Sequence, residues 1–270
     1  MGLIHAIDVY ESFIFDTFGP EANQYDGPES IESLSRPTQN RVAAIIQTHQ
    51  FQTWMSSPTS SILFLNCNSQ GSTSENPSSY LCHKLHDLSV RNSRTSCIVL
   101  SFFCRNHMKP GDPYYGAAGI VQSLISQLLR RVPQLQAQDF VQRLKLHSKA
   151  TMSTSFLCGL LDKLILCLPA DTLVFCGIDA INIHEGHCYS VYQEFEEVVE
   201  SLVQLRERTL INGCMFKLIF TCSWNSHKFY KLVPDQKQDV AWIPTRVSQQ
   251  GGLTSSKWKS VLEKNLKFFA

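Results

Sequence analysis

Residues 66–73, Asn-Cys-Asn-Ser-Gln-Gly-Ser-Thr, follow a short apolar segment and have part of the pattern of a phosphate-binding loop. That pattern, G-x-x-x-x-G-K-S/T, turns backbone amides toward a phosphate, neutralises its charge with lysine and holds magnesium through the hydroxyl. Gly71 and Thr73 keep the second glycine and the hydroxyl, whereas Asn66 replaces the first glycine and Ser72 replaces the lysine. Loss of the ammonium removes a charge-assisted hydrogen bond of about 1.5–3 kcal/mol. We therefore expect weak anion binding at most, and the alternative is a polar turn without a ligand.

A second candidate is Asp179, directly after the apolar segment 173–178. Apolar residues that end in an aspartate are typical of a Walker B strand, whose carboxylate holds Mg²⁺ or its water. Hydrolysis also needs a group that orients the attacking water. Asn182 cannot take a proton, and the nearest carboxylate beyond it is Glu185. The alternative for Asp179 is a capping residue at the end of a strand.

Cysteine and histidine residues after two candidate strands could hold zinc. Cys104 and His107 follow one strand, and His184, His187 and Cys188 follow another, so all five could meet at one edge of a parallel sheet. Cys104 continues an apolar run, and histidines are frequent in polar loops. We therefore expect no metal site.

A cysteine hydrolase would need a nucleophile and a base within reach of each other. Cys67, expected to be exposed in the first loop, and His184 are the only candidates. Nothing else in the sequence supports this reading, so we expect no catalytic residue.

Short apolar segments alternate with amphipathic ones along the chain. Strands are expected at 61–66, 97–103, 173–178, 216–221 and 240–243, and helices at 37–57, 78–88, 116–132, 155–168, 189–206 and 254–266. Asn76 and Pro77 are expected to cap and begin the helix at 78–88. Continuous apolar strands separated by amphipathic helices predict a three-layer α/β sandwich with a parallel sheet. Ligand sites in such a sheet lie beyond the carboxyl ends of the strands.

The chain is expected to contain one large domain. We predict an N-terminal extension and linker at 1–37, an NTPase-like domain at 38–250 and a helical tail at 251–270. The aromatic-rich segment 10–18 is interpreted as a helix that covers the core, with partner docking as the alternative. The segment 19–37, rich in Gly, Pro, Ser and Asn, is interpreted as the linker.

Composition excludes several classes of function. The 270 residues are 43% apolar and 17% charged, with a formal net charge of +1, which favours a folded protein without a basic field for nucleic acid or an acidic membrane. No apolar run is long enough to cross a bilayer, and the first residues do not form an export signal. The ten cysteines include no C-x-x-C pair and are expected to be reduced, which favours a cytoplasmic location.

The order of these segments supports a resemblance to a known family. The segments that carry it are 51–58, 62–66, 100–107, 112–113, 119–129, 174–185 and 216–221. Over residues 38–245 the chain resembles the fungal NACHT/STAND group of P-loop NTPases, in the degenerate branch related to the nephrocystin-type N-terminal NTPase domain. The resemblance implies a mononucleotide-binding α/β core and, in intact members, a signalling switch with helical arms and a repeat array. It also implies a γ-phosphate sensor after 216–221, where the sequence offers Thr221, Ser223 and Asn225.

The departures from the family pattern favour a pseudo-NTPase. We expect a non-catalytic, cytoplasmic scaffold or regulatory domain with a protein partner, without nucleic acid, membrane or a required cofactor. Weak Mg-ATP binding would use Asn66, Gly71, Ser72, Thr73 and Asp179. The alternative is an atypical Mg-dependent ATPase, or NTP-driven switch of the STAND class, in which Thr73 and Asp179 hold Mg-ATP and Glu185 orients water. A distant cation, Lys84 or Arg105, would then replace the missing lysine.

Overall fold

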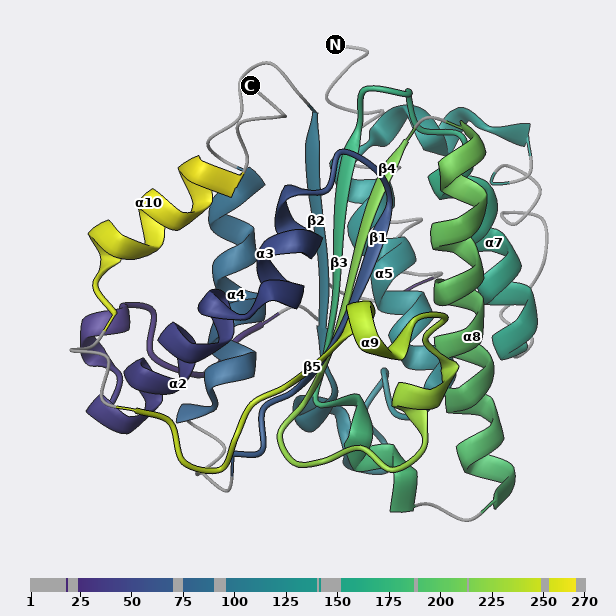
Figure 1. The fold of residues 1–270 in the computed structure, drawn as a ribbon. Helices are drawn as coiled ribbons and strands as arrows, with labels where there is room; N and C mark the ends of the chain where they lie inside the picture. The colour runs from purple at the N-terminus through teal and green to yellow at the C-terminus, as the bar shows by residue number, and fades with distance from the viewer. Residues whose placement is uncertain are drawn as a thin grey trace, which may run out of the picture.

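A computed structural model gives the fold of the chain (Figure 1). It describes residue 18 and residues 24–69, 75–89, 96–139, 141, 152–186, 189–212, 214–248 and 253–265. A parallel sheet forms the middle of three layers, with helices on both faces (Figure 1). This arrangement confirms the expected α/β sandwich. Within the described residues, no helix combines the length and the apolar character that a membrane crossing needs.

The sheet contains five strands in the order β2-β3-β4-β1-β5, and every pair of neighbours is parallel. Their bounds are β1 (Ser61–Asn66), β2 (Cys97–Phe103), β3 (Leu173–Asp179), β4 (Met215–Cys222) and β5 (Val240–Trp242). These bounds agree closely with the apolar segments, because a strand covered on both faces has few polar positions.

Two groups of helices cover the sheet (Figure 1). One face carries α2 (Arg36–Gln47), α3 (His49–Ser56), α4 (Pro77–Ser89) and α10 (Ser255–Asn265), and the other carries α5 (Ala117–Arg131), α7 (Thr154–Leu166) and α8 (Tyr189–Asn212). Shorter turns complete the fold: η1 (Ile31–Ser33), η3 (Cys104–His107), η4 (Pro133–Ala137), η5 (Ile181–Gly186), η6 (Phe229–Leu232) and α9 (Gln236–Asp239).

Each face of the sheet has its own buried core. Along β1, Ile62 and Phe64 belong to the cluster shared with α5, α7 and α8, which we call the α8-side core. Leu63 and Leu65 belong to the cluster shared with α2, α3 and α4, which we call the α3-side core. The alternation follows from the two-residue period of a strand. Gln127 of α5 also closes the outer edge of β2, since its amide accepts from the N–H of Ser101 at 3.0 Å and donates to its carbonyl at 2.8 Å.

The single helix expected at 37–57 is wrong, because the chain breaks at Thr48. Thr48 has an extended conformation with φ −64° and ψ 140°, and its hydroxyl accepts from the N–H of Phe51. Threonine is a favourable N-cap, so α3 starts anew in a different direction. Apolar spacing alone did not reveal the break, since buried residues continue on both sides of it.

The expected linker packs against the core where the structure describes it. Ile31 and Leu34 are buried in the α3-side core. Of the segment 10–18, only Phe18 lies among the described residues, and it is buried in the α8-side core. Before residues 24–27 the chain is therefore attached to the α8-side core by Phe18, and after them it is attached to the α3-side core by Ile31 and Leu34.

Candidate functional site

The carboxyl ends of β1 and β4 form the topological switch point of the sheet. From β1 the chain crosses to β2 on one side, and from β4 it reaches β5 on the other side. A crevice forms where neighbouring strands send their connections in opposite directions, and ligands of open α/β sheets bind there. Residues 67–69 after β1, the first turn of α4 and Asp179 all belong to this edge of the sheet.

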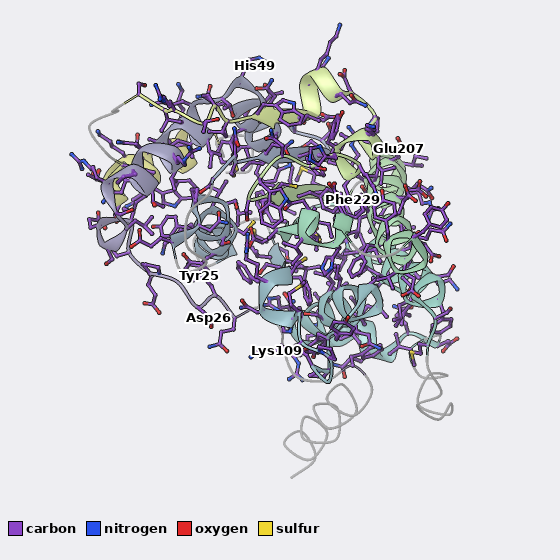
Figure 2. All side chains as sticks on the ribbon, turned by 90° about the horizontal axis from the view of Figure 1, so that it is seen from below. Tyr25, Asp26, His49, Lys109, Glu207 and Phe229 are labelled. Carbon is purple, nitrogen blue, oxygen red and sulfur yellow. The ribbon has the colours of Figure 1, made fainter. Side chains whose placement is uncertain are left out.

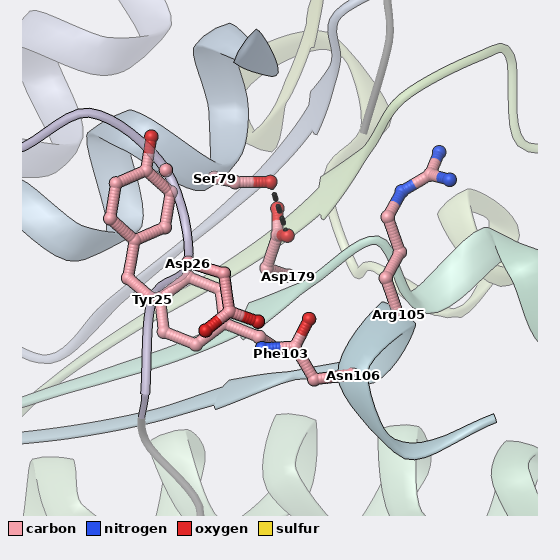
Figure 3. Close-up of a pocket in the computed structure, with 8 residues that line it drawn as sticks. Tyr25, Asp26, Ser79, Phe103, Arg105, Asn106 and Asp179 are labelled. Atoms are coloured by element: carbon pink, nitrogen blue, oxygen red, sulfur yellow. Dashed lines mark hydrogen bonds between the residues drawn. The ribbon is translucent and has the colours of Figure 1, made fainter. Parts of the chain in front are cut away.

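Asp179 is buried at the end of β3 and accepts two hydroxyl hydrogen bonds, and Figure 3 shows the one from Ser79. Ser79 of α4 donates to Oδ2 at 2.6 Å, and Thr221 of β4 donates to Oδ1 at 2.5 Å. Burial raises the pKa of the Asp179 carboxyl, whereas the two hydroxyls and the charge of Arg105 oppose the shift. Asp179 thus joins three elements at the switch point.

The first turn of α4 brings Ser79 to this carboxylate. Asn76 caps the helix, since its Oδ1 accepts from the N–H of Ser78 at 3.0 Å, and Pro77 is the first helical residue, as expected. The Asn76 amide also donates to the Ser223 hydroxyl at 2.7 Å, which ties the cap to the turn after β4. Sequence reasoning missed Ser79, although a hydroxyl on the first turn of the helix that follows the loop is a usable signal.

A pocket of about 280 Å³ opens beside Asp179 (Figure 3). Its lining residues are Tyr25, Asp26, Gly27, Ser79, Phe103, Arg105, Asn106 and Asp179. In Figure 3, Tyr25 and Arg105 stand on opposite sides of Asp179. The guanidinium carbon of Arg105 lies 5.2 Å from the centre of the Trp224 ring, and within the described part of the chain its Nε has no hydrogen-bond partner. The pocket therefore combines one buried carboxylate with one incompletely bonded guanidinium.

A comparison with protein families identifies the domain. The family model described as "Nephrocystin 3, N-terminal" matches residues 41–222. The chain belongs to this family. The match begins inside α2 and ends with β4, so it contains Asn66, Ser79 and Asp179, whereas residues 24–27 and β5 lie outside it. No curated protein and no solved structure matches the chain.

In this nephrocystin 3 N-terminal domain, Asn66 joins the end of β1 to the turn after β4. Its side chain is buried, and its Oδ1 accepts from the N–H of Ser226 at 2.8 Å. Its amide nitrogen has no hydrogen-bond partner within the described residues. Gly71, Ser72 and Thr73 lie outside the described residues, so their part in nucleotide binding stays a prediction.

Glu185 holds the turn after β4 together. Its carboxylate accepts from the N–H groups of His227 at 2.7 Å, Lys228 at 3.2 Å and Phe229 at 3.0 Å, and also from the Ser226 hydroxyl. These bonds give it a structural role, and the water-orienting role stays a prediction. Asn182 is buried in η5 and donates to the carbonyl of Trp224 at 3.3 Å.

The expected exposure of Cys67 is wrong. Its side chain is completely buried, and burial raises the pKa of the thiol to about 12. Arg41 covers this turn by donating to the carbonyl of Cys67 at 2.8 Å. His184 is also buried and stacks on Phe195 with ring centres 3.7 Å apart. A buried thiol cannot serve as an accessible nucleophile, so this pair gives no hydrolase.

The residues weighed as zinc ligands have other surroundings. Burial raises the pKa of the Cys104 thiol well above its usual value, and His107 pairs with Asp112 at 3.0 Å. Within the described residues, no three potential ligands gather around one point. His187 and Cys188 lie outside the described residues.

Proposed function

We propose that this domain is a non-catalytic, NTPase-like scaffold or regulatory module that binds Mg-nucleotide weakly at the Asp179 pocket. The observation that carries the proposal is the hydrogen bond from Ser79 to Asp179. A hydroxyl on the first turn of the helix and a carboxylate at a strand end are the pair that holds magnesium in a phosphate-binding site. The pair is present, so a ligand-binding role is the natural reading of this pocket.

The missing cation argues for weak binding. In the motif, lysine directly precedes the hydroxyl. The hydroxyl that bonds to Asp179 belongs to Ser79, so the lysine position falls on Ser78, whose side chain carries no charge. Lys84 lies six residues further along the helix, roughly 9 Å away along its axis. Its ammonium lies 5.7 Å from the centre of the Tyr80 ring.

The proposal of a non-catalytic role also rests on Glu185 and Asn182. The oxygens of Glu185 accept backbone hydrogen bonds from residues 227–229, which favours a structural carboxylate over a general base. Asn182 cannot take a proton at any physiological pH. With neither group able to activate water, the site has no evident route to hydrolysis.

The proposal extends to the wider class and setting of the protein. We assign the domain to the NACHT/STAND group of P-loop NTPases, of fungal type, in the cytoplasm, with a protein as its partner and with neither nucleic acid nor membrane. The described cysteines are free thiols, which suits a reducing compartment. The net charge of +1 gives no general attraction to polyanions.

One observation favours a second candidate, an atypical Mg-dependent ATPase or STAND-class switch. Arg105 lines the same pocket as Asp179, and its charge opposes the rise that burial causes in the pKa of that carboxyl. A guanidinium binds phosphate through several hydrogen bonds. In this candidate Arg105 replaces the missing lysine, and Glu185 would leave its backbone partners to orient water.

The test is magnesium-dependent ATP turnover by the whole chain, compared with the Ser79→Ala/Asp179→Ala double variant. We expect no difference between the two proteins. Turnover that the double variant lacks, and that Arg105→Met also removes, would establish the second candidate. A thermal melt with and without millimolar Mg·ATP measures binding independently, because a ligand of the folded state raises the midpoint. A small rise in the midpoint that Asp179→Ala abolishes supports weak nucleotide binding at this pocket. If the midpoint does not rise, the domain is an interaction module that binds no nucleotide.

A further inference from the structure

Residues 25–27 form part of the wall of the pocket at Asp179. Tyr25, Asp26 and Gly27 all line it, although they lie outside the stretch that the family model matches. The Tyr25 ring stacks on His83 of α4, with ring centres 4.5 Å apart and planes 18° apart, and its centre lies 5.7 Å from that of Phe103. The tyrosine thus fills the space between α4 and the end of β2.

This segment is held at several points. The Asn106 amide donates to the carbonyl of Gln24 at 2.9 Å, and on the C-terminal side Ile31 is buried in the α3-side core. Before the segment, the carbonyl of Phe18 accepts from the Tyr114 hydroxyl at 3.1 Å, and Phe18 is buried in the α8-side core. Residues 24–27 therefore span the edge of the sheet between two anchored points. Figure 2 shows Tyr25 and Asp26 side by side at this end of the molecule.

The packing of Tyr25 is close but incomplete. Its hydroxyl is buried, and no hydrogen-bond partner for it exists among the residues that the structure describes. A buried polar group without a partner lowers the stability of the state that buries it. Gly27 is needed for this arrangement, since a Cβ at that position would lie 2.3 Å from the Tyr25 ring. Gly27 therefore leaves room for the Tyr25 ring in the wall of the pocket. The buried hydroxyl of Tyr25 makes this position of the ring less stable.

The same residues work against an anionic ligand. Asp26 brings a carboxylate to a pocket that already contains Asp179. The Tyr25 ring is close enough to the site that the charges of Asp179 and Glu75 add to burial in raising the pKa of its hydroxyl. A triphosphate that approaches Asp179 from this side meets both the Tyr25 ring in the wall of the pocket and an additional negative charge.

We propose that residues 24–27 are an autoinhibitory strap, and that a phosphate-bearing ligand reaches Asp179 only when Tyr25 leaves the pocket. The proposal rests on the proposed function, since it takes Asp179 as the centre of the nucleotide site. The closed strap reduces the fraction of molecules that can bind, and the apparent dissociation constant rises by the same factor. Removal of the ring restores that fraction.

The experiment is calorimetric titration of the whole chain with Mg²⁺ and a nonhydrolysable ATP analogue. Tyr25→Ala removes the ring, and Gly27→Ala displaces it through the added Cβ. We expect both variants to bind the analogue at least about fivefold more tightly than the wild type. Tyr25→Phe keeps the ring and removes the unsatisfied hydroxyl, so it must not tighten binding. Tyr189→Ala, at a side chain that is 74% exposed on α8, is the matched control and is expected to leave the affinity unchanged.

Equal or weaker binding by Tyr25→Ala and Gly27→Ala would overturn the strap, and so would the absence of binding by every protein at millimolar analogue. If one variant fails to fold, as a melt would reveal, the other decides the question. Turnover of ATP by the wild type would end the non-catalytic function but not the strap, because the affinity ratio is measured with an analogue that is not cleaved.

Discussion

The two ends of the sheet bury ionisable groups of opposite charge. At the amino end, Lys217 of β4 is completely buried, and its ammonium donates to the carbonyl of Trp54 at 3.0 Å, to the Ser61 hydroxyl at 2.9 Å and to the carbonyl of Ser57. At the carboxyl end, Asp179 accepts hydrogen bonds from two hydroxyl groups, and the first turn of α4 contains no lysine. Both ends satisfy the buried group with uncharged hydrogen-bond partners.

Lys217 shows that this fold can bury a lysine when three oxygens surround its ammonium. The lack of lysine at the start of α4 is therefore not a general consequence of packing in this sheet. The uncharged Ser78 instead lies next to a helix N-terminus that would still suit phosphate and near a carboxylate that would still suit magnesium. Substitutions at each end should separate the structural lysine from the missing functional one.

The largest effect is expected at the amino end. Lys217→Ala leaves three buried oxygens without their donor and opens a cavity, so we expect the free energy of unfolding to fall by about 3–5 kcal/mol. Urea denaturation at pH 7 measures it. Lys237→Ala, at an exposed lysine, is the control and is expected to change stability by less than about 0.5 kcal/mol. If Lys217→Ala is as stable as this control, the buried lysine is not part of the folding energetics.

A smaller effect depends on pH. Burial lowers the pKa of Lys217 from 10.5 to about 7. Between these values the unfolded chain binds more protons than the native protein, so the contribution of Lys217 to stability rises with pH. We expect the stability of the wild type relative to Lys217→Met to increase by about 2 kcal/mol between pH 7 and 9. The buried cysteines titrate in both proteins, so their contribution cancels in the difference. A constant difference across this range would contradict the shift.

The smallest effect is expected at Asp179. Burial raises the pKa of this carboxyl above its usual value of 3.8. The native protein then binds more protons than the unfolded chain just above that pH, so the contribution of Asp179 to stability falls as pH rises. We expect the stability of the wild type relative to Asp179→Asn to decline as the pH rises from 4 to 7. Asp26→Asn, at an exposed carboxylate, serves as the control, and an equal decline in both variants would contradict this account.

Local signals predicted much of the fold. Continuous apolar runs gave the five strands, and Asn76 with Pro77 gave the start of α4, because each signal lies within the element that it specifies. The break between α2 and α3 at Thr48 was not predicted, because a threonine cap cannot be told from any other helical position when apolar residues continue on both sides of it.

The site was less predictable because its contacts join distant segments. Asp179 was expected from the strand that precedes it, but the bond from Ser79 depends on how α4 packs against β3. Cys67 is buried in the α3-side core, which is built from segments distant in the sequence, and the bonds of Glu185 depend on the turn after β4. The entry of Tyr25 into the pocket was hidden in a segment whose composition suggested only a linker.

Restoring the missing cation at Ser78 tests the proposed site. Calorimetry compares the affinity of the wild type, Ser78→Lys and Ser78→Ala for Mg²⁺ with a nonhydrolysable ATP analogue, and Ser72→Lys tests the register that the sequence pattern alone suggests. We predict that Ser78→Lys binds at least about tenfold more tightly than the wild type and Ser78→Ala, since a charge-assisted hydrogen bond is worth about 1.5–3 kcal/mol. Tight binding by the wild type that Ser78→Lys does not improve would contradict this account.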